Sequence, residues 1–308
     1  MALNLSASAD LLSALQAHQD RAASHLNWFA LVDPAQHSAL PQAMNQYGVS
    51  RCLLSYADDA PVAKVSPHLL QLADIDSAAL KWFARNATSA PCATLIASAL
   101  SFEELFKHLS QFLDVEFEDG DLMFLAFWDP AILAALIGQA DDLSLYVRGP
   151  IFSPAQSAAL LAPISAWWYY DRDGFLHEIK AQQPAAATQD HASVLPLKFD
   201  QAQTDLIVEA SVPDQLLSHL QINAPSVLLE HPPATRYAYI KPQLARARTY
   251  GLVGTGDLLN YAGLAFMWGS DFDQHAQIAP LLQQVKNKTL RFDAAMAVMP
   301  DELDKAGK

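Results

Sequence analysis

The sequence holds few of the residues that mark several common classes of protein. Its 308 residues include two cysteines, Cys52 and Cys92, which are too few for a disulfide framework. No run of about 20 apolar residues occurs, so we expect no transmembrane helix. The N-terminal segment lacks the basic start and the long apolar stretch of a signal peptide. We therefore expect a cytoplasmic protein that does not insert into a membrane.

Basic residues are also scarce. The chain has 19 Lys and Arg against 33 Asp and Glu, a net charge of −14, which argues against binding to nucleic acid. The imbalance is uneven, because residues 1–180 hold 9 basic against 20 acidic residues, whereas residues 181–308 hold 10 against 13. An acidic first half keeps a protein soluble, and it is also able to steer a basic partner.

Apolar residues are abundant, at 52% of the chain, while charged residues make up 17%. This composition supports a folded core and excludes a chain that is disordered throughout. The length predicts two domains of about 150 residues each.

The most regular stretch of the sequence is a predicted hairpin around Asp119-Gly120. Asp-Gly suits a tight turn, since glycine adopts a positive φ. Val115 and Phe117 alternate with acidic residues on one side of the turn, and Leu122–Trp128 has no polar side chain on the other side. Because that second strand is apolar on both faces, we expect it inside a sheet that is covered on both sides.

A short helix is predicted to follow this strand. Asp129 is suited to accept hydrogen bonds from the free N–H groups of the helix, and Pro130 at the first position loses none. Ala131–Ile137 supplies the helix, and Gly138 is a typical residue to end it. Asp129 and Pro130 are therefore predicted to act as a structural cap.

The chain as a whole predicts an α+β fold: a mixed β-sheet lobe with flanking helices, followed by a helical C-terminal lobe. The first lobe covers residues 1–181, residues 182–195 form a linker, and residues 196–308 form the second lobe. In the first lobe, strands are predicted at Trp28–Val32, Arg51–Ser55, His68–Leu72, Cys92–Ser98, Leu143–Val147, Ile164–Tyr170 and Phe175–Ile179. In the second lobe, helices are predicted at Phe199–Val212, Pro213–Ile222, Pro242–Tyr250, Asp257–Trp268, Gln274–Asn287 and Arg291–Met299.

No motif in the sequence predicts a reaction. His177-Glu178 lacks the second histidine of a zinc protease, and Gly254-Thr255-Gly256 lacks the third glycine of a dinucleotide-binding loop. The ten histidines show no paired metal-ligand spacing. Cys52 is suited to nucleophilic chemistry only if a histidine lies beside it in space; a buried thiol is the alternative. We therefore predict no enzyme, no cofactor and no metal, with an enzyme or a small-ligand protein whose site assembles only in the fold as the alternative.

Two segments are candidates for binding a partner protein. Aromatic residues are frequent anchors at interfaces, although half of a hairpin normally faces the core. Basic and aromatic residues also gather in one segment of this otherwise acidic chain. The alternative interpretation of that segment is a solvated helix face that binds no partner. The candidate residues are Trp167, Trp168 and Tyr170 in the first segment, and Arg236, Tyr239, Arg246 and Arg248 in the second.

Several short motifs, in this order and spacing, resemble a known family over roughly residues 26–179. The central matches are Leu125, Phe127, Trp128, Asp129, Pro130, Gly149 and Pro150. Further matches are Phe29–Asp33, Ser66–Leu69, Ser101–Leu105 and His108-Leu109. The sequence is similar to the effector adaptors of bacterial type VI secretion, a family known as domain of unknown function 4123. Ala126 and Ala131 stand where that family usually has arginines.

The resemblance implies a function that the residues alone do not. Members of this family are adaptors or chaperones that bind one secreted effector. They help to load it onto the valine-glycine-repeat spike protein (VgrG) of the secretion apparatus. The expected partners of this chain are therefore a cognate effector and VgrG, and the second lobe is the expected seat of specificity.

Overall fold

The structure is a computed structural model that describes residues 2–22, 25–54, 60–88, 90–180 and 194–306. The chain divides into two compact units, Met1–Ala210 and Ser211–Lys308. The division lies inside a helix, α8 (Gln201–Asn223). Residues 182–193 of the predicted linker lie outside the described residues.

A six-stranded sheet forms the centre of the first unit, in the order β2-β3-β1-β4-β7-β8. Its strands are β1 (Asn27–Val32), β2 (Ser50–Cys52), β3 (His68–Leu72), β4 (Ala93–Ser98), β7 (Ile164–Tyr170) and β8 (Leu176–Lys180). The predicted α+β class is confirmed. The prediction of a mixed sheet is wrong, because all neighbouring strands are antiparallel. The strands β3 and β4 do run in the same direction, but β1 lies between them.

Each strand supplies side chains to both faces of the sheet, because successive residues of a strand point to opposite sides. Phe29 and Leu31 join a core on one face, while Trp28, Ala30 and Val32 join a second core on the other face. The sheet is therefore the middle layer of three, and its central strands, β1 and β4, are buried along almost their whole length.

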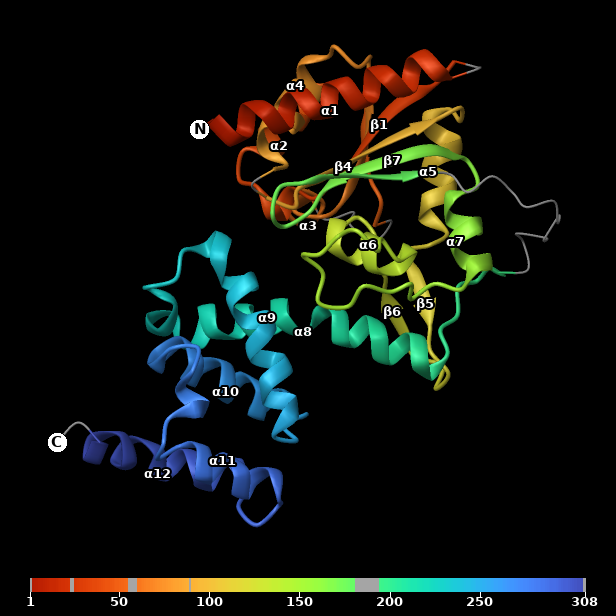
Figure 1. Ribbon diagram of the computed structural model, residues 1–308. Helices are drawn as coiled ribbons and strands as arrows, with labels where there is room; N and C mark the ends of the chain where they lie inside the picture. Colours follow the sequence, from red (N-terminus) through yellow and green to blue (C-terminus); the bar gives the residue numbers. More distant parts are fainter. Residues whose placement is uncertain (1, 23–24, 55–59, 89, 181–193, 307–308) are drawn as a thin grey trace. The chain divides into compact units, whose positions relative to one another are not determined.

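Helices cover both faces of the sheet, as Figure 1 shows for α1 and α4 on one side and for α6 and α7 on the other. The first unit also contains a 3-10 turn at Pro34–Gln36. Its helices are α1 (Ala2–Arg21), α2 (Leu40–Met44), α3 (Ala60–Ala63), α4 (Ala78–Asn86), α5 (Phe102–Ser110), α6 (Pro130–Ile137), α7 (Pro154–Leu161) and the first part of α8.

The predicted hairpin at Asp119-Gly120 exists, with Gly120 at φ 88°, but it lies outside the main sheet. It forms a separate pair of strands, β5 (Asp114–Glu116) and β6 (Leu122–Phe124). The prediction of a strand covered on both faces is wrong, because Leu122 is 72% exposed and Phe124 is 49% exposed. The run is apolar for another reason: after the strand ends, Leu125 and Phe127 turn into the core and are almost fully buried.

The predicted cap of α6 is confirmed. The Asp129 carboxylate accepts hydrogen bonds from the backbone N–H groups of Ala131 (2.8 Å) and Ile132 (3.2 Å), and Pro130 is the first helical residue. Gly138 ends the helix in the left-handed conformation, as expected.

The predicted strand at Leu143–Val147 does not form; turns and irregular chain occupy this region. One carboxylate oxygen of Asp142 accepts hydrogen bonds from both the backbone N–H and the hydroxyl of Ser144. Such local bonds favour a turn over a strand.

The second unit is helical within its described residues, as predicted. Pro213 and Pro242, each expected to begin a helix, lie inside longer helices, and Gly254, rather than Asp257, precedes α10. Buried residues on both sides of each proline, such as Ile240 and Leu244 around Pro242, keep the helix packed despite the lost hydrogen bond. The elements are the rest of α8, α9 (Pro233–Thr249), α10 (Thr255–Trp268), α11 (Ala279–Lys286) and α12 (Phe292–Ala306), with 3-10 turns at Pro225–Leu228 and Phe272–Gln274.

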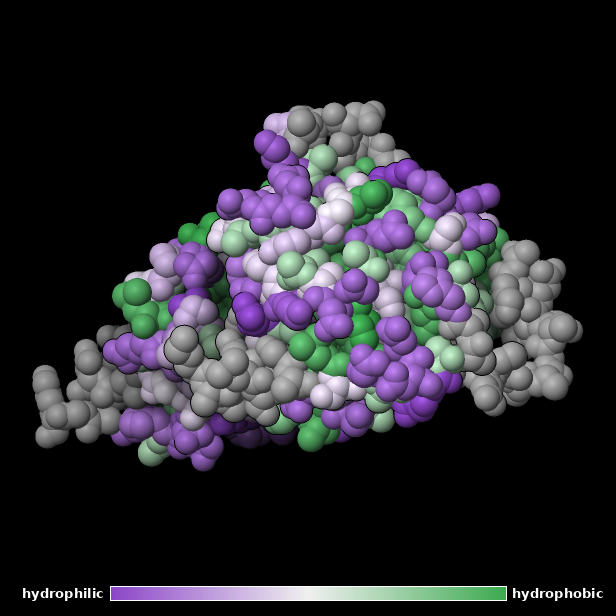
Figure 2. Space-filling model, turned by 90° about the horizontal axis from the view of Figure 1, so that it is seen from above, coloured by the Kyte–Doolittle hydropathy of each residue, from purple (hydrophilic) through white to green (hydrophobic). Residues whose placement is uncertain are grey.

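The second unit begins later than the predicted lobe, which starts at residue 196. Leu197, Phe199 and Ile207 are buried in a core of the first unit, so this stretch packs with the sheet. Within the described part of the chain, no helix is both long and apolar enough to cross a membrane. On the face seen in Figure 2, hydrophobic residues lie in small groups between hydrophilic ones.

Candidate functional site

The aromatic residues of β7 form the centre of the first unit rather than a surface for a partner. Trp167 and Tyr169 face one core and Trp168 and Tyr170 face the other, and each of the four is at most 5% exposed. The prediction that Trp167, Trp168 and Tyr170 bind a partner is therefore corrected. A strand covered on both sides buries every residue, whichever way its side chain points.

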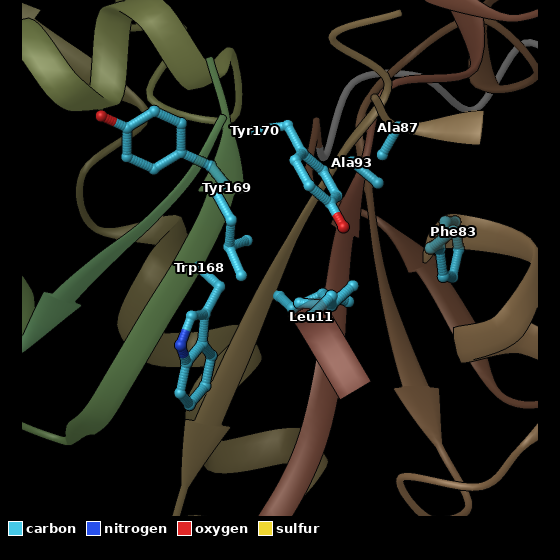
Figure 3. A pocket seen from close by; sticks show the side chains of 9 residues that line it. Leu11, Phe83, Ala87, Ala93, Trp168, Tyr169 and Tyr170 are labelled. Atoms are coloured by element: carbon cyan, nitrogen blue, oxygen red, sulfur yellow. The ribbon is translucent and has the colours of Figure 1, made fainter. Parts of the chain in front are cut away.

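A small cavity lies between this strand and α1. Figure 3 shows Tyr170 pointing toward Leu11 and Phe83, whereas Tyr169 points to the other side of β7. The cavity has a volume of about 10 Å³, which is room for about one water molecule and not for a larger ligand. The indole N–H of Trp168 is buried and has no hydrogen-bond partner in the described structure.

A serine, a histidine and a glutamate lie close together near Trp168. His18 of α1 lies with Nε2 2.9 Å from Ser165 Oγ and with Nδ1 3.6 Å from Glu178 Oε1. Its ring packs edge-on against Trp168, with 5.0 Å between the ring centres. Burial lowers the pKa of His18, and the nearby Glu178 raises it in part.

Ser165 owes its position to an irregularity of the sheet. Ala97 pairs with Ala166 and Ser98 with Ile164, so Ser165 is an extra residue in a β-bulge. The three side chains come from positions 18, 165 and 178, and no motif spacing in the sequence connects them. The geometry suits a hydrogen-bonded link between α1 and the sheet. The same order of groups, from serine to histidine to carboxylate, also activates a serine as a nucleophile in enzymes.

A second polar cluster lies at the turn between β7 and β8. His177 Nε2 is 2.9 Å from Asp171 Oδ2, and the Tyr169 hydroxyl donates to Asp142 Oδ2 over 3.0 Å. Burial raises the pKa of Tyr169 far above its usual value, and the charge of Asp142 adds to this effect, so Tyr169 stays a neutral donor. Potential ligand atoms of Asp142, Asp171 and His177 lie within 4.8 Å of one another.

The two carboxylates of this cluster already have structural partners. Asp171 accepts hydrogen bonds from the backbone N–H groups of Asp173 (2.9 Å) and Phe175 (2.8 Å), which shape the turn. Asp142 holds the turn at Ser144 in the same way. The cluster therefore fastens two loops to the end of the sheet. Spacing along the sequence gives no sign of it, because its members are 29 and 6 residues apart.

The motifs that carried the resemblance meet at the end of β1. Asp33 is buried, and its carboxylate accepts hydrogen bonds from the Ala35 N–H, the Gln36 amide and the side chain of Trp128. Burial raises the pKa of Asp33; these hydrogen bonds oppose the shift, and the nearby Asp129 adds to it. Two motifs almost one hundred residues apart thus form one structural cluster.

Gly149 lies close to α6. Its φ is 66°, and a Cβ at this position would come within 1.9 Å of the Ala135 carbonyl oxygen. Two residues later, Ile151 donates its backbone N–H to the same oxygen over 3.1 Å. Glycine is therefore required here for both its conformation and its size.

In the second unit, Arg236 and Tyr239 hold helices together. Arg236 donates to the backbone oxygens of His231 (2.9 Å) and Leu228 (3.2 Å) and to the Gln221 side chain (2.8 Å). The Tyr239 hydroxyl donates to the Ala265 carbonyl over 2.6 Å. Both side chains are half-buried, and their polar ends are engaged inside the unit.

Arg246 is also engaged inside the second unit. It forms ion pairs with Asp271 (3.2 Å) and with Asp273 (2.9 Å), whose carboxylate also accepts from the Tyr261 hydroxyl over 2.9 Å. Asp273 is 2% exposed, so Arg246 neutralises a buried charge. Arg248 is half-buried in the last turn of α9. The structure thus gives Arg236, Tyr239 and Arg246 structural roles, and their part in binding remains a prediction.

An open hollow of about 320 Å³ lies on the first unit, lined mainly by residues of β1, β3 and the chain around Gly48. Its titratable side chains include His25, Tyr47 and Asp74. Asp74 accepts a hydrogen bond from the backbone N–H of Asp76 and so serves a turn. Neither hydrogen bonds nor ion pairs link these three side chains in the described structure.

Comparison with known proteins gives one family. Residues 28–144 match the family described as Domain of unknown function (DUF4123). The match includes most of the central sheet, both Asp-Pro motifs and α6. It ends before Gly149 and before β7 and β8. No curated protein and no solved structure matches the chain.

Proposed function

We propose that this protein is an adaptor that binds a secreted effector of a bacterial type VI secretion system and helps to load it onto the VgrG spike. The observation that carries the proposal is the match of residues 28–144 to DUF4123, together with the motifs through which the sequence resembles that adaptor family. The hydrogen bond from the half-buried Trp128 to the buried Asp33 gives two of these motifs a common structural role.

The way the described side chains are used is compatible with binding rather than catalysis. The carboxylates of Asp142, Asp171 and Asp273 are buried and hold turns or an arginine in place. The cavity beside Trp168 is too small for a substrate. An adaptor needs a sizeable surface that releases its partner, so it requires no such pocket.

An enzyme is the alternative function, and the arrangement of Ser165, His18 and Glu178 favours it. In a hydrolase, His18 would take the proton of the Ser165 hydroxyl as that oxygen attacks a carbonyl group. The distance of 3.6 Å between His18 and Glu178 is longer than a hydrogen bond, and neither described pocket is lined by any of the three. These two facts favour the structural role.

Deleting the gene tests the adaptor function in the cell. We expect that the cognate effector, encoded by a neighbouring gene, is no longer delivered, while the secretion machine still releases its tube protein. A deletion that stops release of the tube protein would show a role in the machine itself and would refute the adaptor function.

A hydrolysis assay separates the alternative. Purified protein is incubated with p-nitrophenyl esters of several chain lengths, next to the variants Ser165→Ala and His18→Gln. We expect no turnover above that of the variants. Turnover that both variants abolish, while they remain folded by circular dichroism, would establish an enzyme.

A further inference from the structure

The strand β8 lies at one edge of the six-stranded sheet. It pairs with β7 on its inner side and with no other strand of the described chain. An edge strand presents backbone N–H and C=O groups that a further strand is able to pair with.

The hydrogen bonds of the hairpin show which groups of β8 point outward. The Asp171 N–H donates to the Phe175 oxygen over 2.9 Å, so these two residues form a hydrogen-bonded pair. In an antiparallel ladder such pairs alternate with non-bonded ones. With the observed register, the backbone N–H and C=O groups of His177 and Ile179 point toward β7, and those of the remaining β8 residues point outward, away from the sheet. The residues whose backbone groups point outward are Leu176, Glu178 and Lys180. Among the backbone hydrogen bonds of the described structure that lie outside helices and ladders, none involves these three residues.

The side chains around this edge include a carboxylate on each face of the sheet, and the exposed Lys180 at the end of β8 lies with its Nζ 3.8 Å from Glu178 Oε2. Glu178 lies on the face of α1, next to His18, and is 24% exposed. On the other face, Asp141 is 73% exposed and lies 3.6 Å from His177 Nδ1. Phe175, directly before β8, is 68% exposed. The edge therefore offers an apolar contact at its start and carboxylates on either side.

The opposite edge of the sheet is less suited to pairing. The strand β2 has three residues, whereas β8 has five. Arg51 of β2 lies in a bidentate pair with Glu103 and over the rings of Phe102 and Phe106. An added strand has fewer backbone groups to bind there.

We propose that β8 binds an extended, basic segment of the effector as an additional strand of the sheet. The inference rests on the proposed function, because it names the part of the effector that the adaptor recognises. Backbone hydrogen bonds to Leu176, Glu178 and Lys180 supply affinity. Phe175, Glu178 and Asp141 supply specificity through alternate side chains of the segment. The acidic excess of residues 1–180 attracts such a segment before it docks.

Hydrogen exchange of single backbone amides, followed by NMR, tests the geometry. In the free protein, the amides of His177 and Ile179 are expected to exchange slowly and those of Glu178 and Lys180 fast. When the co-expressed product of the neighbouring effector gene is bound, the amides of Glu178 and Lys180 are expected to become slow. Slow exchange of these two amides already in the free protein would show that the edge is occupied and would overturn the proposal.

A proline variant tests the binding itself. Lys180→Pro removes an outward N–H and no hydrogen bond of the ladder, so the sheet is expected to remain intact. Lys180→Ala is the matched control, since it removes the side chain and keeps the N–H. We expect Lys180→Pro to weaken binding of the effector-gene product by about tenfold or more. Lys180→Ala is expected to bind as the wild type does. Near-ultraviolet circular dichroism confirms that both variants are folded.

The outcomes separate the two proposals. A folded Lys180→Pro variant with wild-type affinity overturns strand addition and leaves the adaptor function standing. A wild-type protein that forms no complex refutes the adaptor function, and strand addition of an effector with it. A wild-type dimer that Lys180→Pro converts to a monomer shows that the occupant is a second copy of this chain, which also overturns the proposal.

Discussion

Replacing Arg246 tests the interior of the second unit. Its guanidinium lies 2.9 Å from Asp273 Oδ1 and 3.2 Å from Asp271 Oδ1, and Asp273 is 2% exposed. In Arg246→Ala, the buried carboxylate keeps the hydroxyls of Tyr261 (2.9 Å) and Tyr250 (3.3 Å) as its partners. A buried negative charge would then have no positive partner.

The expected loss follows from the burial of the two groups. Removing one partner of a fully buried ion pair costs about 3–5 kcal/mol. Because the Arg246 side chain is 30% exposed and two hydroxyls remain, we expect about 2–4 kcal/mol. In a unit of this size, that loss lowers the melting temperature by roughly 10–25 °C.

The measurement is thermal unfolding of the full chain, combined with hydrogen exchange and mass spectrometry of peptides from α9 and α10. Arg291→Ala is the control, because Arg291 is also ion-paired, with Asp293 at 2.8 Å, but is 86% exposed. Such an exposed surface pair contributes little to stability. Equal stability losses in the two variants, or an Arg246→Ala variant as stable as the wild type, would refute the structural role of Arg246.

Three further predictions concern the first unit. Replacing Asp129 by Ala removes two hydrogen bonds to the start of α6, so urea unfolding should show a loss of about 1 kcal/mol; no loss would contradict the cap. Burial lowers the pKa of His68 and of His108 below 6.5 in the folded protein, so these histidines take up protons more readily in the unfolded chain than in the folded one. The free energy of unfolding should therefore fall as the pH drops from neutral to about 5, and less steeply in His108→Gln; a rise would contradict this sign. Burial raises the pKa of Cys92 to about 12, so thiol reagents should modify Cys52 before Cys92, as peptide mapping will show, and the reverse order would contradict the burial.

Local signals in the sequence predicted local structure well. Ser101 and Glu104, whose spacing is typical of a capping box, form one at the start of α5, and Asp129 caps α6. These elements depend on hydrogen bonds between residues two to four positions apart, which the sequence displays directly. Leu122–Trp128 shows the limit of this reasoning. An apolar run fits a strand covered on both sides as well as a short exposed strand followed by a buried turn.

The candidate site could not be predicted in the same way. Trp167, Trp168 and Tyr170 fit an interface as well as a core, and the second layer of helices decides for the core. Ser165 meets His18 across 147 positions because a bulge in β7 and the packing of α1 bring them together. Neither feature has a signature along the sequence. Arg246 belongs to a basic segment, but its role depends on its ion pairs with Asp271 and Asp273. These two residues come after the end of the next helix, α10.

The most direct test of the central claim is a binding measurement between the purified protein and the product of the neighbouring effector gene. Isothermal titration calorimetry should show a saturable complex, and size-exclusion chromatography should show both proteins in one peak. The proteins encoded by more distant effector genes of the same genome should give no heat and no shared peak. Equal binding to all of these proteins, or binding to none, would contradict a specific effector adaptor.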